Sequence, residues 1–246
     1  MRVGVVCEGP SDYPAISIFL ADALQRRSIT AEVRPVFPEL DRTRPEGGWG
    51  NVLLWLKRNP PETRIAKYFN GGLFAGELAT TPLDALVFHL DADIVDDELF
   101  RGYVKKTYEH EVALHNQPAE RAGSIKQVLR LAADLENLTQ TDVQKHVLAV
   151  AVEATESWCV AAFHAQPGEY EVLRGQALID AFMTVLERSE GRQPQGNYAN
   201  IDKNADRRRR FCRKHAAGSE RLIQTCDQFK EAVDALEVLA ANRGLR

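Results

Sequence analysis

Short runs of apolar and β-branched residues alternate along the chain with stretches in which apolar residues recur at helical spacing. Three runs, at residues 2–7, 83–90 and 146–152, are nearly continuously apolar. Such runs are typical of strands buried on both faces of a parallel sheet. Residues 31–37 predict a further strand, and residues 64–69 a short one.

Helices are predicted between these strands. Asp12 can cap a helix whose apolar residues recur at helical spacing as far as Arg27. A second helix, at residues 49–58, is stopped by Pro60 and Pro61. Asp96 is expected to cap a helix running to about residue 115. Further helices are predicted at residues 124–138 and 155–164. Residues 39–50 predict a loop, and Gly71 with Gly72 a turn.

This alternation of strands and helices predicts an α/β fold, a Rossmann-like parallel sheet with helices on its faces. From about residue 168 onward the pattern is helical and offers no convincing strand. We therefore expect an α/β domain at residues 1–165 and an α-helical C-terminal extension at residues 166–246. Apolar residues at helical spacing in the extension would serve either packing within the chain or a homo-oligomer.

Composition narrows the class of protein. Of 246 residues, 44% are hydrophobic, which is enough for a substantial core. The formal net charge of −4 argues against a general nucleic-acid coat but leaves room for a local basic groove. The four cysteines show no zinc-site spacing, and the chain shows neither a signal-peptide pattern nor an apolar run of membrane-spanning length. We expect a cytoplasmic protein with reduced thiols and no membrane partner.

Acidic residues follow three of the predicted strands: Glu8 after the first, Asp91 and Asp93 after the next buried run, and Glu153 with Glu156 after the last. The carboxyl ends of parallel strands meet at one edge of a sheet, where ligands gather. Clustered carboxylates repel one another unless a cation neutralises them. Because oxygen ligands suit Mg²⁺ or Mn²⁺, the pattern predicts a shared divalent-metal site.

Two of these stretches carry a resemblance to a known family. Residues 5–12, with sequence VVCEGPSD, resemble the first motif of the Toprim domain, and residues 89–93, HLDAD, resemble its Asp-x-Asp motif. The chain looks closest to small stand-alone bacterial Toprim-like proteins, of the overcoming-lysogenization-defect nuclease type. Such proteins are often encoded beside an ATPase and are linked to defence against phage. Residues 152–158 and the tail, with Lys203, Arg221 and the segment 226–229, match more loosely.

The resemblance implies a Mg²⁺-dependent nuclease with a partner ATPase. Glu8 would be a general acid/base or a metal ligand, and Asp91 and Asp93 would hold Mg²⁺. A second ion, as in two-metal nucleases, would use Asp12, Glu153 and Glu156. Lys203 would reach the scissile phosphate.

A basic run in the tail supplies candidate contacts for nucleic acid. On a helix, Arg207, Arg210 and Lys214 would share one face, and Arg213 lies close by. Arginine and lysine neutralise phosphates regardless of base sequence. A solvent-exposed helix surface is the other interpretation of the run.

Two other functions remain open. The segment 91–95 approximates the signature of haloacid-dehalogenase-type phosphohydrolases, with Asp91 as a covalent nucleophile. Alternatively, the chain is a non-catalytic subunit that binds nucleic acid or a partner ATPase without cutting.

Overall fold

The computed structural model describes residues 1–38, 47–70, 81–166 and 168–245. Its sheet has the strand order β2-β1-β3-β4, and each neighbouring pair is parallel. The strands are β1 (Arg2–Val6), β2 (Glu32–Phe37), β3 (Ala85–Asp91) and β4 (His146–Ala151). The predicted α/β fold with a parallel sheet, flanking helices and C-terminal helices is therefore confirmed.

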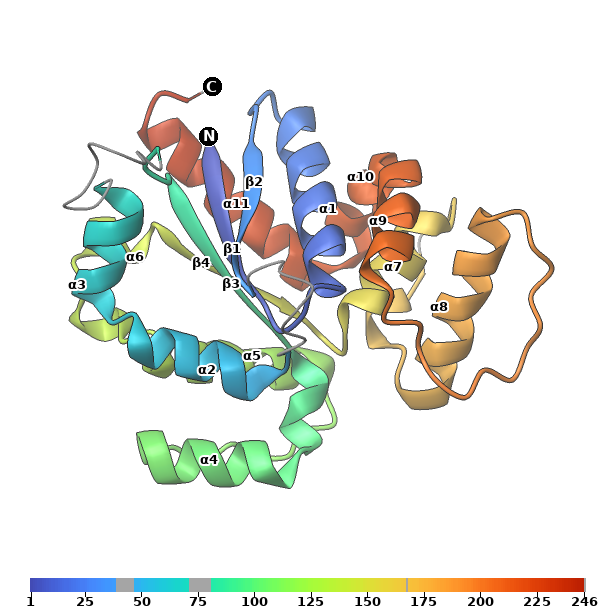
Figure 1. Ribbon diagram of the computed structural model, residues 1–246, viewed down its shortest axis with the longest axis horizontal. Coiled ribbons are helices and arrows are strands. Elements are labelled where there is room, and N and C mark those ends of the chain that lie inside the picture. The colour runs from blue at the N-terminus through green and yellow to red at the C-terminus, as the bar shows by residue number, and fades with distance from the viewer. Residues whose placement is uncertain (39–46, 71–80, 167, 246) are drawn as a thin grey trace.

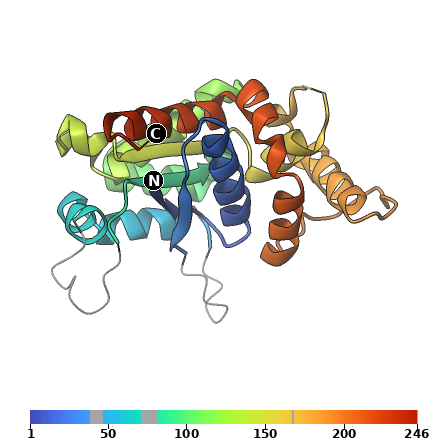
Figure 2. The same cartoon turned by 90° about the horizontal axis from the view of Figure 1, so that it is seen from above.

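Two layers of helices cover the sheet (Figures 1 and 2). On one face lie α1 (Asp12–Arg26) and α11 (Asp227–Asn242), and on the other α2 (Trp49–Arg58) and α5 (Pro118–Ala132). Successive strand residues point to opposite faces, so both faces of an apolar strand can be buried. The adjacent residues Val5 and Val6 accordingly belong to two different hydrophobic clusters, one under each layer.

The remaining helices extend or connect these layers. They are α3 (Pro61–Arg64), α4 (Glu98–Tyr108), α6 (Gln140–Val143), α7 (Thr155–Phe163), α8 (Gly175–Ser189), α9 (Ala205–Lys214) and α10 (Ser219–Thr225). Figure 1 shows α7, α9 and α10 beside α1. The side chains of Phe211, Leu222 and Phe229 belong to the same cluster as Val5 of β1. The C-terminal helices thus share a core with the sheet, which holds α9 next to α7.

The strand predicted at residues 64–69 is wrong, because this segment is helical. Ile65–Phe69 forms a π-helical turn directly after α3. Pro61 occupies the first turn of α3, where its fixed φ angle favours a helix. Arg64 is buried, and its guanidinium donates hydrogen bonds to the carbonyls of Asn59 and Ala133. These contacts fix the segment as a helix.

The boundaries of two helices, α4 and α5, also differ from the predicted ones. Asp97, rather than Asp96, caps α4, accepting a hydrogen bond from the Leu99 N–H at 2.8 Å. That helix ends at Tyr108 instead of near residue 115, and α5 covers residues 118–132 instead of 124–138.

Two further predictions concern a turn and a loop. The predicted turn at Gly71 and Gly72, and most of the predicted loop at residues 39–50, lie outside the described residues. Among the helices of the described residues, none has the length and apolar character needed to cross a membrane.

The close packing of the C-terminal helices on α7 can be tested at Gly218. A Cβ atom there would lie 2.3 Å from the Ala162 carbonyl oxygen. We expect Gly218→Ala to lower the free energy of unfolding by about 1–3 kcal/mol, because backbone must move to relieve the overlap. The matched control is Gly123→Ala in α5, where nothing lies within 4 Å. It should stabilise the protein by about 0.5–1 kcal/mol, because alanine favours helices. Urea denaturation measures both, and equal stability of the two variants would contradict the close approach.

Candidate metal centre

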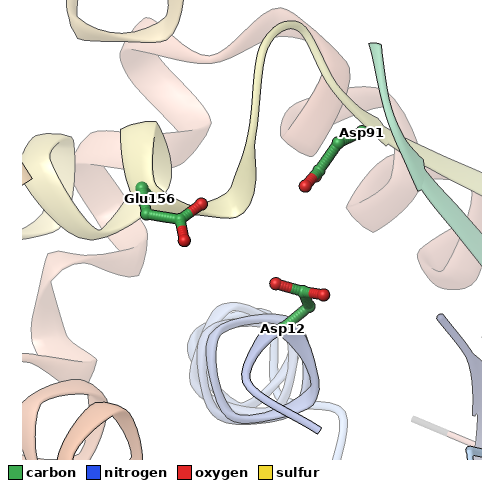
Figure 3. Close-up of side chains that lie close together, drawn as sticks. All are labelled: Asp12, Asp91 and Glu156. Atoms are coloured by element: carbon green, nitrogen blue, oxygen red, sulfur yellow. The ribbon is translucent and has the colours of Figure 1, made fainter. Parts of the chain in front are cut away.

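Three buried carboxylates converge at the carboxyl edge of the sheet. Asp12, Asp91 and Glu156 each contribute one oxygen, and these oxygens lie within 4.8 Å of one another. Figure 3 shows the three side chains pointing into the same space from the start of α1, the end of β3 and the start of α7. We call this group the carboxylate triad.

The chain brings the triad together through three strand-to-helix junctions. Asp91 is the last residue of β3, whereas Asp12 opens α1 shortly after β1. The Asp12 N–H donates to the Gly9 carbonyl at 3.1 Å, which closes the turn between β1 and α1. Glu156 lies in the first turn of α7, just beyond β4. Helix N-termini favour negative charge, so α1 and α7 both support a carboxylate at these positions.

Hydrogen bonds from Thr155 and the backbone orient the carboxylates. The Thr155 N–H donates to Asp91 Oδ1 at 3.2 Å, and its hydroxyl donates to Asp12 Oδ1 at 3.0 Å. The Asp91 N–H in turn donates to Glu8 Oε1 at 2.9 Å. Glu8 is therefore fixed beside the triad, although its carboxylate is not one of the three converging groups.

Two cations approach the triad from the C-terminal part of the chain, Arg208 from α9 and Lys203 from the segment just before it. Arg208 is buried; its Nη2 donates to Glu156 Oε1 at 2.5 Å and its Nη1 donates to Thr155 Oγ1 at 3.1 Å. The same guanidinium lies 3.7 Å from Asp12 Oδ1. Lys203 Nζ lies 3.3 Å from Glu156 Oε1, on a side chain that is 64% exposed. Positive charge thus reaches Glu156 from a buried side and from an open side.

The donor set fits a hard divalent cation. All three members of the triad offer oxygen, the element that Mg²⁺ and Mn²⁺ prefer in proteins. Glu156 Oε2 is buried and has no hydrogen-bond partner among the residues that the structure describes. A buried polar atom without a partner costs free energy, and a cation in the triad would remove that cost.

The carboxylates differ in how they hold protons. Burial and the nearby carboxylates of Asp12 and Asp93 raise the pKa of Glu8 to about 8. Burial and neighbouring carboxylates also raise the pKa of Asp91 well above its usual value. For Glu156, burial is outweighed by Arg208 and Lys203, which lower its pKa to about 2. Glu156 is thus ionised at neutral pH, whereas Glu8 is largely protonated there.

The remaining predicted ligands lie differently. Asp93 lies two residues after Asp91 and is exposed. Partial desolvation and the Glu156 carboxylate raise its pKa to about 6. Glu153 is turned towards two arginines, 3.2 Å from Arg121 Nε and 3.0 Å from Arg174 Nε. Both arginines also bind Asp96. Glu153 is therefore engaged in an ion-pair network, and the structure does not bring it into the triad.

The basic residues predicted to bind nucleic acid lie away from the buried face of α9. Arg207 is paired with Glu190 and Asp202, at 2.6 Å from each. Three others, Arg210, Arg213 and Lys214, are exposed. Since successive helix residues are about 100° apart, this set lies on other sides of α9 than Arg208. Its role in binding nucleic acid stays a prediction.

Sequence patterns did not identify Arg208 and Thr155 as site residues. Arg208 lies in the middle of the basic run, but Phe211 and Cys212 follow it at helical spacing and are buried with it. That spacing was the available signal for an inward-facing arginine. Thr155 lies between the apolar Ala154 and the acidic Glu156, and no sequence motif distinguishes it.

His89 is buried next to the triad. Burial lowers its pKa to about 3, so the imidazole is neutral. Its Nε2 lies 3.6 Å from Asp91 Oδ1, its ring packs edge-on against Trp158, and neither ring nitrogen has a hydrogen-bond partner.

Comparisons of the chain with protein-family models, with curated proteins and with solved structures find no match.

The raised pKa values predict how stability depends on pH and metal. Glu8 has a folded pKa of about 8 against an ordinary value of 4.5. Between these values the folded state binds more protons than the unfolded state, so stability falls as pH rises through this window. A cation held by the triad competes with the proton on Asp91, whose pKa is also raised, so the rise in melting temperature caused by Mn²⁺ should be larger at about pH 8 than at about pH 6. Scanning fluorimetry measures this, and a shift that shrinks with pH would contradict the triad as the binding site.

Variants in which a neutral amide replaces a carboxylate distinguish the roles of the triad and of the neighbouring ion-pair network. Asp12→Asn removes a triad oxygen and should weaken Mn²⁺ binding at least about tenfold. Glu153→Gln should leave Mn²⁺ affinity within about twofold while lowering stability, since it breaks a buried ion pair. Isothermal titration and urea denaturation give the two readouts. Loss of Mn²⁺ binding in Glu153→Gln would place Glu153 among the ligands instead.

Proposed function

We propose that this protein is a divalent-cation-dependent phosphodiesterase that hydrolyses nucleic acid, with Mg²⁺ or Mn²⁺ as its cofactor. The observation that supports it is the convergence of Asp12, Asp91 and Glu156 within 4.8 Å at the carboxyl edge of a parallel sheet. In such sheets this edge is the usual position of ligands.

A divalent cation held by the triad would stabilise negative charge on a phosphodiester and favour deprotonation of an attacking water. The protein's own groups divide the remaining tasks. Glu8 is half-buried with a pKa of about 8, so it carries a proton at neutral pH that it can donate to a leaving oxygen. Lys203 has a largely exposed ammonium at the open side of Glu156, where it can bind an anionic phosphate.

The choice of nucleic acid as substrate rests on two further features. One is the resemblance of residues 5–12 and 89–93 to Toprim motifs. The other is the exposed set Arg210, Arg213 and Lys214 on α9, the helix that also contributes Arg208. By the same resemblance, we propose that the nuclease acts in the cytoplasm with a partner ATPase in defence against phage.

Cleavage assays test this proposal. Purified protein should cut DNA or RNA in Mg²⁺ or Mn²⁺ and lose that activity in EDTA. Asp91→Asn should lower the rate at least about a hundredfold, because it removes a charge that holds the cation. Glu62→Gln, an exposed change of the same chemistry on α3, is the control and should cleave normally. The proposal is contradicted if the protein, alone and with its partner ATPase, cuts neither substrate in either metal.

The same assays separate the alternatives. Bis-p-nitrophenyl phosphate reports diester hydrolysis, whereas p-nitrophenyl phosphate reports monoester hydrolysis. Turnover of only the monoester, with a trapped aspartyl-phosphate at Asp91, would favour the haloacid-dehalogenase-type activity. Binding of nucleic acid without turnover of any ester would favour a non-catalytic subunit.

A further inference from the structure

We infer that the carboxylate triad takes a single divalent cation, and that Arg208 supplies the fixed positive charge that a second cation would otherwise bring. This inference rests on the proposed metal-dependent function and sets its ion stoichiometry. It departs from the pair of metal ions that the sequence resemblance implies.

The ligand geometry provides room for one ion. Within the described part of the chain, the triad is the sole group of three or more Asp, Glu, His or Cys ligand atoms that gather within 4.8 Å. Glu8 and Asp93 do not complete a second group of this kind. Glu156 Oε2, buried and without a hydrogen-bond partner, independently indicates that a cation is expected on that side of the carboxylate.

The other oxygen of Glu156 is already occupied. Glu156 Oε1 accepts hydrogen bonds from Arg208 Nη2 and Lys203 Nζ. Arg208 Nη1 reaches Thr155 Oγ1, the hydroxyl that donates to Asp12 Oδ1. A second ion bridging Glu156 and Asp12 on this side would have to displace the guanidinium.

Displacing Arg208 is unfavourable, because the side chain is enclosed. It is 1% exposed, and its guanidinium carbon lies 4.7 Å from the ring centroid of Phe182. An arginine guanidinium is not deprotonated in proteins, so its charge is permanent. We therefore assign Arg208 as a positioning residue: it contacts the ligands Glu156 and Asp12 rather than the substrate, and fixes how many ions they can hold.

Mn²⁺ binding to the full-length protein tests this directly. Isothermal titration and metal analysis after gel filtration should give one equivalent for the wild type. Electron paramagnetic resonance should show isolated Mn²⁺ without the coupling of a closely spaced pair. Arg208→Met removes the guanidinium from beside Glu156 Oε1 and Asp12 Oδ1, so it should bind two equivalents and show a coupled spectrum. Arg208→Lys keeps a positive charge at this position and should return to one equivalent.

Arg209→Met is the matched control. This residue is on the same helix but pairs with Asp206, at 2.7 Å, and should bind one equivalent like the wild type. Circular dichroism and the melting temperature establish that each variant is folded. If Arg208→Met does not fold, the wild type and Arg208→Lys still decide the stoichiometry.

The outcomes separate the two proposals. Two equivalents with a coupled spectrum in the wild type overturn the single-ion site while leaving a metal-dependent nuclease standing. One equivalent in folded Arg208→Met overturns the role of Arg208. No Mn²⁺ binding in the wild type contradicts the proposed function itself.

Discussion

The buried ion pair between Glu156 and Arg208 links the packing of the C-terminal helices to the carboxylate triad. It joins the first turn of α7 to α9, so it ties the end of the sheet domain to the C-terminal helices. Removing one partner of such a pair leaves an uncompensated charge in the interior, at a cost of about 3–5 kcal/mol. The pair also keeps Glu156 ionised. Lys203 lies just before α9 and is thereby held close to Glu156. The contact between Glu156 and Arg208 therefore has both a structural role and a proposed chemical role.

The edge of the sheet neutralises its negative charge in three ways. Glu156 is paired with an arginine, Glu153 is shared between Arg121 and Arg174, and Glu8 retains a proton. Only the last way leaves a carboxylate that can release and take up a proton near neutral pH. Carboxylates only three residues apart in sequence, such as Glu153 and Glu156, thus receive different roles from the cations that face them.

Much of this arrangement could be predicted from the sequence, for a physical reason. Parallel strands place their carboxyl ends together, so acidic residues after separate apolar runs, such as Asp91 and Glu156, had to lie near one another. Two things could not be predicted. Periodicity in a short segment such as 64–69 does not distinguish strand from helix. A run of four arginines does not show which one faces inward, since that depends on the core that Phe211 and Cys212 join.

The triad and its arginine come from distant parts of the chain, since Asp12 lies near the beginning and Arg208 in the last of the regions that meet there. Contacts of such long sequence separation form late, because a large loop must close first. During synthesis on the ribosome, the sheet strands emerge well before α9 does, and domains begin to fold as they emerge. The triad therefore cannot meet Arg208 until α9 has emerged. Before that point, Glu156 lacks the buried cation that compensates its charge in the interior.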